Sequence, residues 1–323
     1  MDSEDTHQDQ EVQKAAQQAT QQATQQERKK KYYLSACILI RTIEPFLFAE
    51  LLHYYRLVGV EHFYIFDNLG IYDLRDLLRG NEDITLHIVD GETGQENVLM
   101  GVYNFCMYEY REETEYLVYV DDDEFINFTE QFHSIPEVLR HLEEPDLLVL
   151  NWLFMGCGPY RTRPFHQLLL ESNRFSGKTF DIQTKCIYRT SQVEFVPSPH
   201  FAKMKDGSRA VDGAGDAVPF VGGNHQLCRN PLIWEHHYFI QSRNEFRLKC
   251  ERGHVVPGAR RDYDKEIQQS NEQSVMKNIM MARWIEKFKE KGIHTAMDAI
   301  QQIHHPAAPL LPVHYLSHTK PET

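Results

Sequence analysis

An apolar run that ends in three successive carboxylates constrains the fold of this chain more than any other feature. Residues 116–120 have the composition of a buried β-strand, and Asp121, Asp122 and Asp123 follow them directly. Three adjacent carboxylates repel one another, so stability alone does not explain them. A divalent cation among them would, because Mg²⁺ and Mn²⁺ prefer oxygen ligands. The alternative interpretation is an acidic turn.

The elements expected around this run alternate between strands and helices. Strands are expected at 35–40, 62–66, 84–89, 116–120, 147–152 and 184–189, and helices at 45–58, 73–78 and 97–111. This order predicts an α/β fold with a mainly parallel central sheet flanked by helices and a mixed second half. Ligands collect at the carboxyl ends of such strands, where residues 41–44, 67–68 and 121–123 fall.

The chain is expected to divide into a leader, a main domain and a tail. Residues 1–31 are rich in glutamine and predict a disordered or helical leader. The main domain spans 32–291, with a nucleotide-binding half at 32–125 and an acceptor half at 126–291. Within it, the charged segment 201–221 is expected to be a mobile loop, able to close over a donor. An amphipathic helix is expected within 274–291, and residues 292–323 form a loosely attached tail.

Charge and hydropathy exclude several classes of protein. The formal net charge of −13 argues against a nucleic-acid partner. No apolar run approaches the ~20 residues that a transmembrane helix needs, and the polar N-terminus does not resemble a secretory signal. The expectation is therefore a cytoplasmic or otherwise soluble protein. None of the six cysteines forms a C-x-x-C pair, which argues against a zinc ribbon.

Six sequence blocks, in order over roughly residues 33–255, resemble glycosyltransferase family 92. They are 41–44 (RTIE), 59–68 (GVEHFYIFDN), 121–125 (DDDEF), 152–156 (WLFMG), 185–189 (KCIYR) and 237–249 (HY, then S, EF and K). Met155 stands where that family usually has an aromatic residue. The resemblance rests on the order of all six blocks, since any one block alone would be weak evidence for the family.

The resemblance implies a GT-A fold and a metal-dependent enzyme with Mn²⁺ or Mg²⁺. It implies transfer of a hexose, with galactose from UDP-galactose as the first expectation, from a nucleotide-sugar donor to a glycan or glycoprotein acceptor, with inversion. Many relatives are anchored in the Golgi, whereas this chain resembles soluble enzymes such as those of large DNA viruses; Golgi residence is expected only if an anchor was removed. The alternatives are a nucleotide-diphosphate hydrolase or nucleotidyltransferase, and a non-catalytic nucleotide-sugar-binding protein.

The resemblance assigns a metal site to Asp121, Asp123 and His237. Asp123 is the first choice as a direct ligand, while Asp121 could instead bind the ribose or a metal-bound water. Asp122 is either a donor contact or a spacer. His237 could alternatively be a core histidine, with His236 and His200 as weaker candidates for the third ligand.

Further residues are candidates for donor binding and for the general base. The donor-binding candidates are Arg41, Glu44, Asp67, Asn68, Gln95 and Lys185, with Arg189, Lys249 and Arg252 as other possible partners of the diphosphate. Asp67 and Asn68 could instead form an Asx-turn, Glu44 could be a helix-start charge, and Trp152 could either stack on a sugar or pack in the core. Inversion requires a base, for which Asp206, Asp212 and, further, Glu124 are candidates.

Overall fold

A large mixed sheet runs through the second of the two units into which the chain divides, Met1–Lys31 and Tyr32–Thr323. The structure, a computed structural model, describes residues 30–41, 44–68, 70, 72–90, 96–157, 161–164, 166–219, 227–252 and 260–316. The expectation for the leader at 1–31 lies almost entirely outside these residues.

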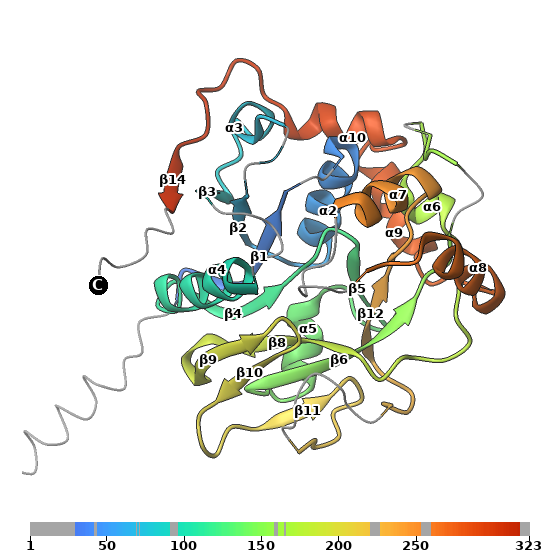
Figure 1. The fold of residues 1–323 in the computed structure, drawn as a ribbon. Coiled ribbons are helices and arrows are strands. Elements are labelled where there is room, and N and C mark those ends of the chain that lie inside the picture. The colour runs from blue at the N-terminus through green and yellow to red at the C-terminus, as the bar shows by residue number, and fades with distance from the viewer. Residues whose placement is uncertain are drawn as a thin grey trace, which may run out of the picture. The chain divides into compact units, whose positions relative to one another are not determined.

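The sheet is parallel in its first half and mixed in its second (Figure 1). Its strands are β1 (Tyr32–Ile40), β2 (His62–Asp67), β3 (Ile84–Val89), β4 (Thr114–Tyr119), β5 (Glu124–Phe128), β6 (Leu147–Phe154), β8 (Thr184–Arg189), β11 (Ala210–Asp212), β12 (Ile233–His237) and β14 (Val313–Leu316). Their order is β14-β3-β2-β1-β4-β8-β6-β12-β5, with β11 beside β6. The strands from β14 to β4 are mutually parallel, while β8 and β5 run antiparallel to their neighbours.

Helices cover both faces of this sheet. They are α2 (Pro45–Leu57), α3 (Leu74–Leu77), α4 (Glu96–Glu109), α5 (Ile135–His141), α6 (Leu169–Ser172), α7 (Arg243–Arg252), α8 (Tyr263–Gln273), α9 (Ala282–Glu290) and α10 (Ala296–Ile303). Alternate residues of β1 enter two cores: Ala36 and Ile38 pack with α2, and Cys37 packs with α4. The predicted α/β fold with a mainly parallel central sheet is confirmed.

Helix α2 illustrates how local sequence sets the frame. Pro45 starts it, where a missing N–H costs nothing. Gly59 follows its end with φ of +100°, and a Cβ there would lie 2.8 Å from Pro136 Cδ. The predicted apolar face is buried as expected, Leu47 and Leu51 included.

One expectation for the second half is wrong and another is confirmed. The segment expected to be a mobile loop contains β10 (Phe201–Met204), paired with β9 (Val193–Ser198), and β11, paired with β6. Ala202, Met204 and Val211 are buried despite the charged neighbours. The amphipathic helix expected within 274–291 is present as α9, which buries Trp284, Ile285 and Phe288. It follows the short strand β13 (Met276–Lys277), which pairs with β7 (Phe175–Ser176).

Residues 293–316 are packed rather than loosely attached, and residues 317–323 lie outside the described ranges. Helix α10 buries Ala296, Ala299 and Ile303, and β14 joins the sheet beside β3. The sheet also crosses the boundary expected at residue 125, and the division into donor and acceptor halves stays a prediction. Among the residues described, no helix combines the length and apolar character needed to cross a membrane.

Candidate active site

The site lies at the carboxyl edge of the parallel strands. Arg41 follows β1, Asn68 follows β2 and Asp121 comes shortly after β4. Strand β1 lies between β2 and β4, so the chain leaves it in one direction and later returns on its other side. Such a reversal of strand order opens a crevice outside the carboxyl ends, the usual ligand position in open α/β sheets.

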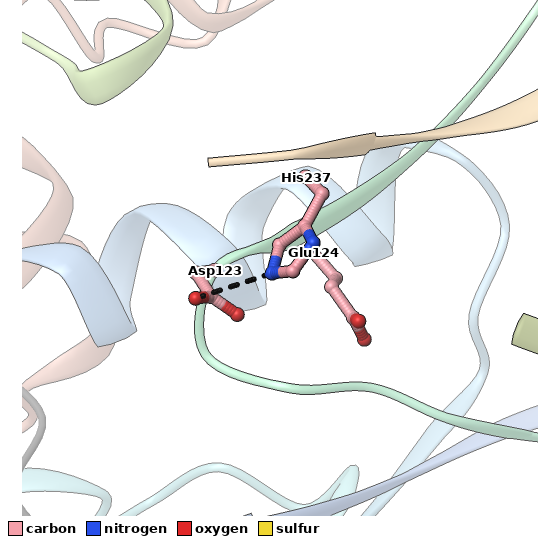
Figure 2. Close-up of side chains that lie close together, drawn as sticks. All are labelled: Asp123, Glu124 and His237. Atoms are coloured by element: carbon pink, nitrogen blue, oxygen red, sulfur yellow. Dashed lines mark ion pairs between the residues drawn. The ribbon is translucent and has the colours of Figure 1, made fainter. Parts of the chain in front are cut away.

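Two carboxylates and an imidazole meet at this edge. Asp123 precedes β5, Glu124 is the first residue of β5, and His237 is the last residue of β12. Antiparallel pairing sets His237 directly opposite Glu124. One potential ligand atom from each of the three residues lies within 4.8 Å of the others. In Figure 2 the dashed line joins the His237 ring to the Asp123 carboxylate, where Nε2 is 3.5 Å from Oδ2.

This group fits a divalent cation. Asp123, Glu124 and His237 are buried, and buried carboxylates require compensation by partners or by a metal. Glu124 Oε1 makes no hydrogen bond to the described part of the chain. Carboxylate oxygens with one imidazole form a donor set that suits Mn²⁺. Glu124 thus stands in the converging group, whereas Asp121 was expected there; the ligand role of Asp121 stays a prediction.

A buried lysine links Asp121 to Glu124. Lys185 Nζ lies 2.8 Å from Asp121 Oδ2 and 3.1 Å from Glu124 Oε2, and the lysine side chain is only 1% exposed. The Asp121 N–H also donates to Glu124 Oε2 over 3.0 Å. The structure therefore places Lys185, a predicted donor contact, under the acidic run, where it orients both carboxylates.

A second lysine, on α7, pairs with the deeper aspartate. The Lys249 ammonium contacts Asp123 Oδ2. Burial opposes ionisation of Asp123, but the nearby Lys249 and His237 lower its pKa below the usual range. In contrast, burial and the neighbouring Glu235 raise the pKa of Glu124 well above its usual value. The pKa values of the adjacent residues Asp123 and Glu124 are therefore shifted in opposite directions.

Comparison with known proteins decides the family. Residues 32–215, more than half of the chain, match the model of glycosyltransferase family 92. The chain belongs to glycosyltransferase family 92. This confirms the predicted family and makes the protein a glycosyltransferase, which implies a nucleotide-sugar donor and a glycan acceptor. No curated protein matches the chain in sequence.

Two solved structures show a distant likeness to this family 92 member. One is 4-diphosphocytidyl-2C-methyl-D-erythritol synthase from Anaerococcus prevotii, with 13% identity, a TM-score of 0.29, and coverage of 50% of this chain and 71% of that one. Another is HddC from Yersinia pseudotuberculosis, with 12% identity, a TM-score of 0.34, and coverage of 68% and 98%. At these scores the likenesses do not bear on function.

At the end of β2, the Asp67 side chain of the glycosyltransferase binds the backbone three residues on, not two residues on as in the Asx-turn that was the alternative. Asp67 Oδ1 accepts a hydrogen bond of 2.7 Å from the Gly70 N–H. A Cβ on Gly70 would lie 2.7 Å from the Arg41 carbonyl oxygen, so Gly70 packs tightly against the end of β1. Asn68 Nδ2 donates to the Val89 carbonyl over 3.0 Å. These bonds shape the edge, and donor binding by both residues stays a prediction.

The other residues predicted to bind the nucleotide-sugar donor have few described contacts. Glu44 precedes α2, and its carboxylate oxygens lie 3.5 Å from the Tyr72 hydroxyl. The backbone carbonyl of Asp122 accepts a hydrogen bond of 3.4 Å from Gln241 Nε2. Gln95 lies outside the described residues, as does the side chain of Arg252.

The weaker histidine candidates and Trp152 are all packed against other residues of the protein. His236 is fully buried, and burial lowers its pKa to about 3. His200 Nδ1 lies 3.0 Å from the Thr184 carbonyl oxygen. Trp152 is 6% exposed, and its ring centroid is 4.3 Å from that of His237. The tryptophan thus packs against the candidate metal ligand.

The two candidate bases lie on the β10–β11 segment. Asp206 is exposed in the turn between those strands. Asp212 Oδ1 accepts hydrogen bonds from the N–H groups of Ala214 and Asp216, which stabilises the turn after β11. Asp212 lies beside Val149, early in β6, whereas His237 pairs with the last residue of that strand. Neither aspartate joins the Asp123 group within the described ranges.

Sequence reasoning missed Glu235. This residue is fully buried in β12, and burial raises its pKa to about 8. Neither carboxylate oxygen makes a hydrogen bond of ordinary geometry to described residues, although the Trp152 indole favours the charged form. The available signal was a lone acid within the otherwise apolar and aromatic sequence of β12.

Proposed function

We propose that this glycosyltransferase is metal-dependent and transfers a hexose, with galactose from UDP-galactose as the first candidate, to a hydroxyl of a glycan acceptor with inversion. The observation that carries the proposal is the meeting of Asp123, Glu124 and His237 at the carboxyl edge of the sheet. These residues would hold Mn²⁺ or Mg²⁺, which would neutralise charge that develops on the leaving diphosphate.

The remaining residues at this edge support the same function. Lys185 holds Asp121 and Glu124 at fixed positions, and such preorganisation avoids rearrangement during the reaction. Arg41 and Asp67 lie at the carboxyl ends of β1 and β2, the edge of the sheet where a nucleoside would lie next to the cation site. Trp152 excludes water from one side of His237.

The test is a transfer assay on the full chain with a panel of UDP-sugars, a mixture of glycan acceptors and Mn²⁺. The expected products are UDP and an acceptor whose mass has grown by one hexose. The new linkage should have the anomeric configuration opposite to that of the donor by NMR. UMP together with a sugar 1-phosphate would instead indicate a hydrolase and overturn the proposal.

A control without metal sharpens the assay. Treatment with EDTA followed by gel filtration should abolish transfer, and added Mn²⁺ should restore it. Transfer that survives EDTA at the full rate would contradict the metal role while leaving the glycosyltransferase activity intact.

A further inference from the structure

The two lysines of the site differ in how firmly they are held. Lys185 is 1% exposed and lies between two carboxylates. Lys249 is 18% exposed and pairs, within the described ranges, with Asp123 alone. A lysine ammonium sits on a flexible four-carbon stem. Lys249 therefore has both the freedom and the solvent access to change partners, which Lys185 lacks.

The surroundings keep Lys249 near the site when it moves. Its Nζ lies 4.6 Å from the centroid of the Phe239 ring, and that ring is 5.6 Å from the ring of His237. A cation over an aromatic face is attracted to it. Arg261 donates a hydrogen bond of 3.2 Å to the Lys249 carbonyl oxygen, which anchors the backbone. The ammonium can thus shift while the helix stays in place.

The Asp123 carboxylate cannot serve two cations at the same oxygen without cost. Lys249 and His237 both approach Oδ2. A divalent ion that binds this oxygen would lie close to the ammonium, and like charges at such short range repel strongly when water is largely excluded. Metal binding therefore requires Lys249 to withdraw.

We propose that Lys249 is an exchangeable counter-ion, which leaves Asp123 when the divalent cation binds and then pairs with the donor diphosphate. The inference rests on the proposed function, because it takes the cation and the diphosphate from there. It predicts that metal and nucleotide assist each other: the metal frees the ammonium for the nucleotide, and the nucleotide stabilises the ammonium in its new position.

Mn²⁺ binding with and without UDP tests this exchange, with free Mn²⁺ measured by electron paramagnetic resonance. In Lys249→Met, Mn²⁺ alone should bind roughly 10-fold more tightly than in the wild type, because its competitor is gone. UDP, measured by calorimetry at saturating Mn²⁺, should bind roughly 10-fold more weakly, and the mutual enhancement should shrink accordingly. Tighter metal binding with weaker nucleotide binding is a combination that a purely structural lysine would not give.

Two variants control for charge and folding. Lys265→Met removes an exposed charge from the neighbouring helix α8 and should change neither affinity. Lys249→Arg keeps the positive charge and should keep the wild-type Mn²⁺ affinity within about threefold, because competition follows charge. If Lys249→Met fails to fold, Lys249→Gln is the second neutral variant.

The outcomes separate the two proposals. If both neutral variants bind Mn²⁺ as the wild type does, or more weakly, counter-ion exchange is overturned while the metal site stands. If the wild type itself binds no Mn²⁺, with or without UDP, the metal-dependent function fails and the exchange fails with it.

Discussion

Lys185 and Asp121 lie 64 positions apart in sequence, yet their charged atoms are 2.8 Å apart. Strand β8 runs antiparallel to β4, so the start of β8 lies beside the end of β4. The ammonium reaches Glu124 as well, at 3.1 Å. Lys185 thus reduces the repulsion within the acidic run even without a metal ion.

Removal of this lysine should destabilise the protein strongly. Lys185→Met would leave Asp121 and the fully buried Glu124 without the lysine that contacts both. Loss of one partner from a buried pair costs about 3–5 kcal/mol of unfolding free energy. Urea unfolding followed by circular dichroism should show this loss at neutral pH.

The matched control is Lys203→Met. Lys203 pairs with Glu194 at the surface, where its side chain is 57% exposed, so the unfolding midpoint should not move. A Lys185→Met variant as stable as Lys203→Met would show that the contacts of Lys185 with Asp121 and Glu124 do not stabilise the protein.

The pH dependence of stability should contain a contribution from Glu50. This fully buried residue of α2 accepts hydrogen bonds from the N–H groups of Leu169 and Leu170, and burial raises its pKa from 4.5 to about 7. Between these two values the unfolded chain releases the proton while the folded chain retains it. The contribution is present below about pH 4.5 and is lost as pH rises through about 7.

Glu50→Gln removes this titration. Relative to the variant, the wild type should lose roughly 3 kcal/mol of unfolding free energy between pH 4.5 and 7 and no more above it. Denaturant titrations at half-unit pH steps would measure the difference. Parallel pH profiles for the two proteins would contradict this assignment.

The C-terminal helix should be part of the folded core. Ile303 is fully buried in α10, and Ile303→Ala should cost about 2–5 kcal/mol of unfolding free energy through lost burial and a cavity. Met297, on the same helix, is 38% exposed, and Met297→Ala should cost far less. Equal and small effects in thermal unfolding would mean that α10 contributes little to stability.

The two histidines beside Trp152 should behave differently toward metal. His237→Ala should weaken Mn²⁺ binding by at least about 10-fold, the smallest effect seen for residues that only hydrogen-bond to a metal ligand. His200→Ala removes a ring that contacts the tryptophan edge-on, with centroids 5.4 Å apart, and should leave Mn²⁺ affinity unchanged. The reverse order of effects would move the metal site toward His200.

Local patterns in the sequence were sufficient to predict the first half of the fold. The spacing of Leu47 and Leu51 identified the buried face of α2, and the apolar runs identified β2, β3 and β4. The helical spacing of Ala296, Ala299 and Ile303 was also present, but the neighbouring histidines and prolines obscured so short a helix.

Local sequence patterns could not predict how strands far apart in the sequence pair with one another. The sequence predicted that Asp121, Asp123 and His237 share one site. Which side chains meet there, however, depends on how β12 pairs with β5. That register brings Glu124 to His237, while Asp121 turns toward Lys185. A shift of one residue would reverse both faces.

Calorimetric titration of UDP into the wild type and Asp123→Asn, each with Mn²⁺ and with EDTA, tests the central claim most directly. We expect UDP to bind the wild type with Mn²⁺, and either EDTA or the substitution to weaken binding by at least about 100-fold, since a direct ligand should matter at least as much as the residues that orient it. Asp122→Asn should bind like the wild type. Equal UDP affinity in EDTA and in Mn²⁺ would contradict the account.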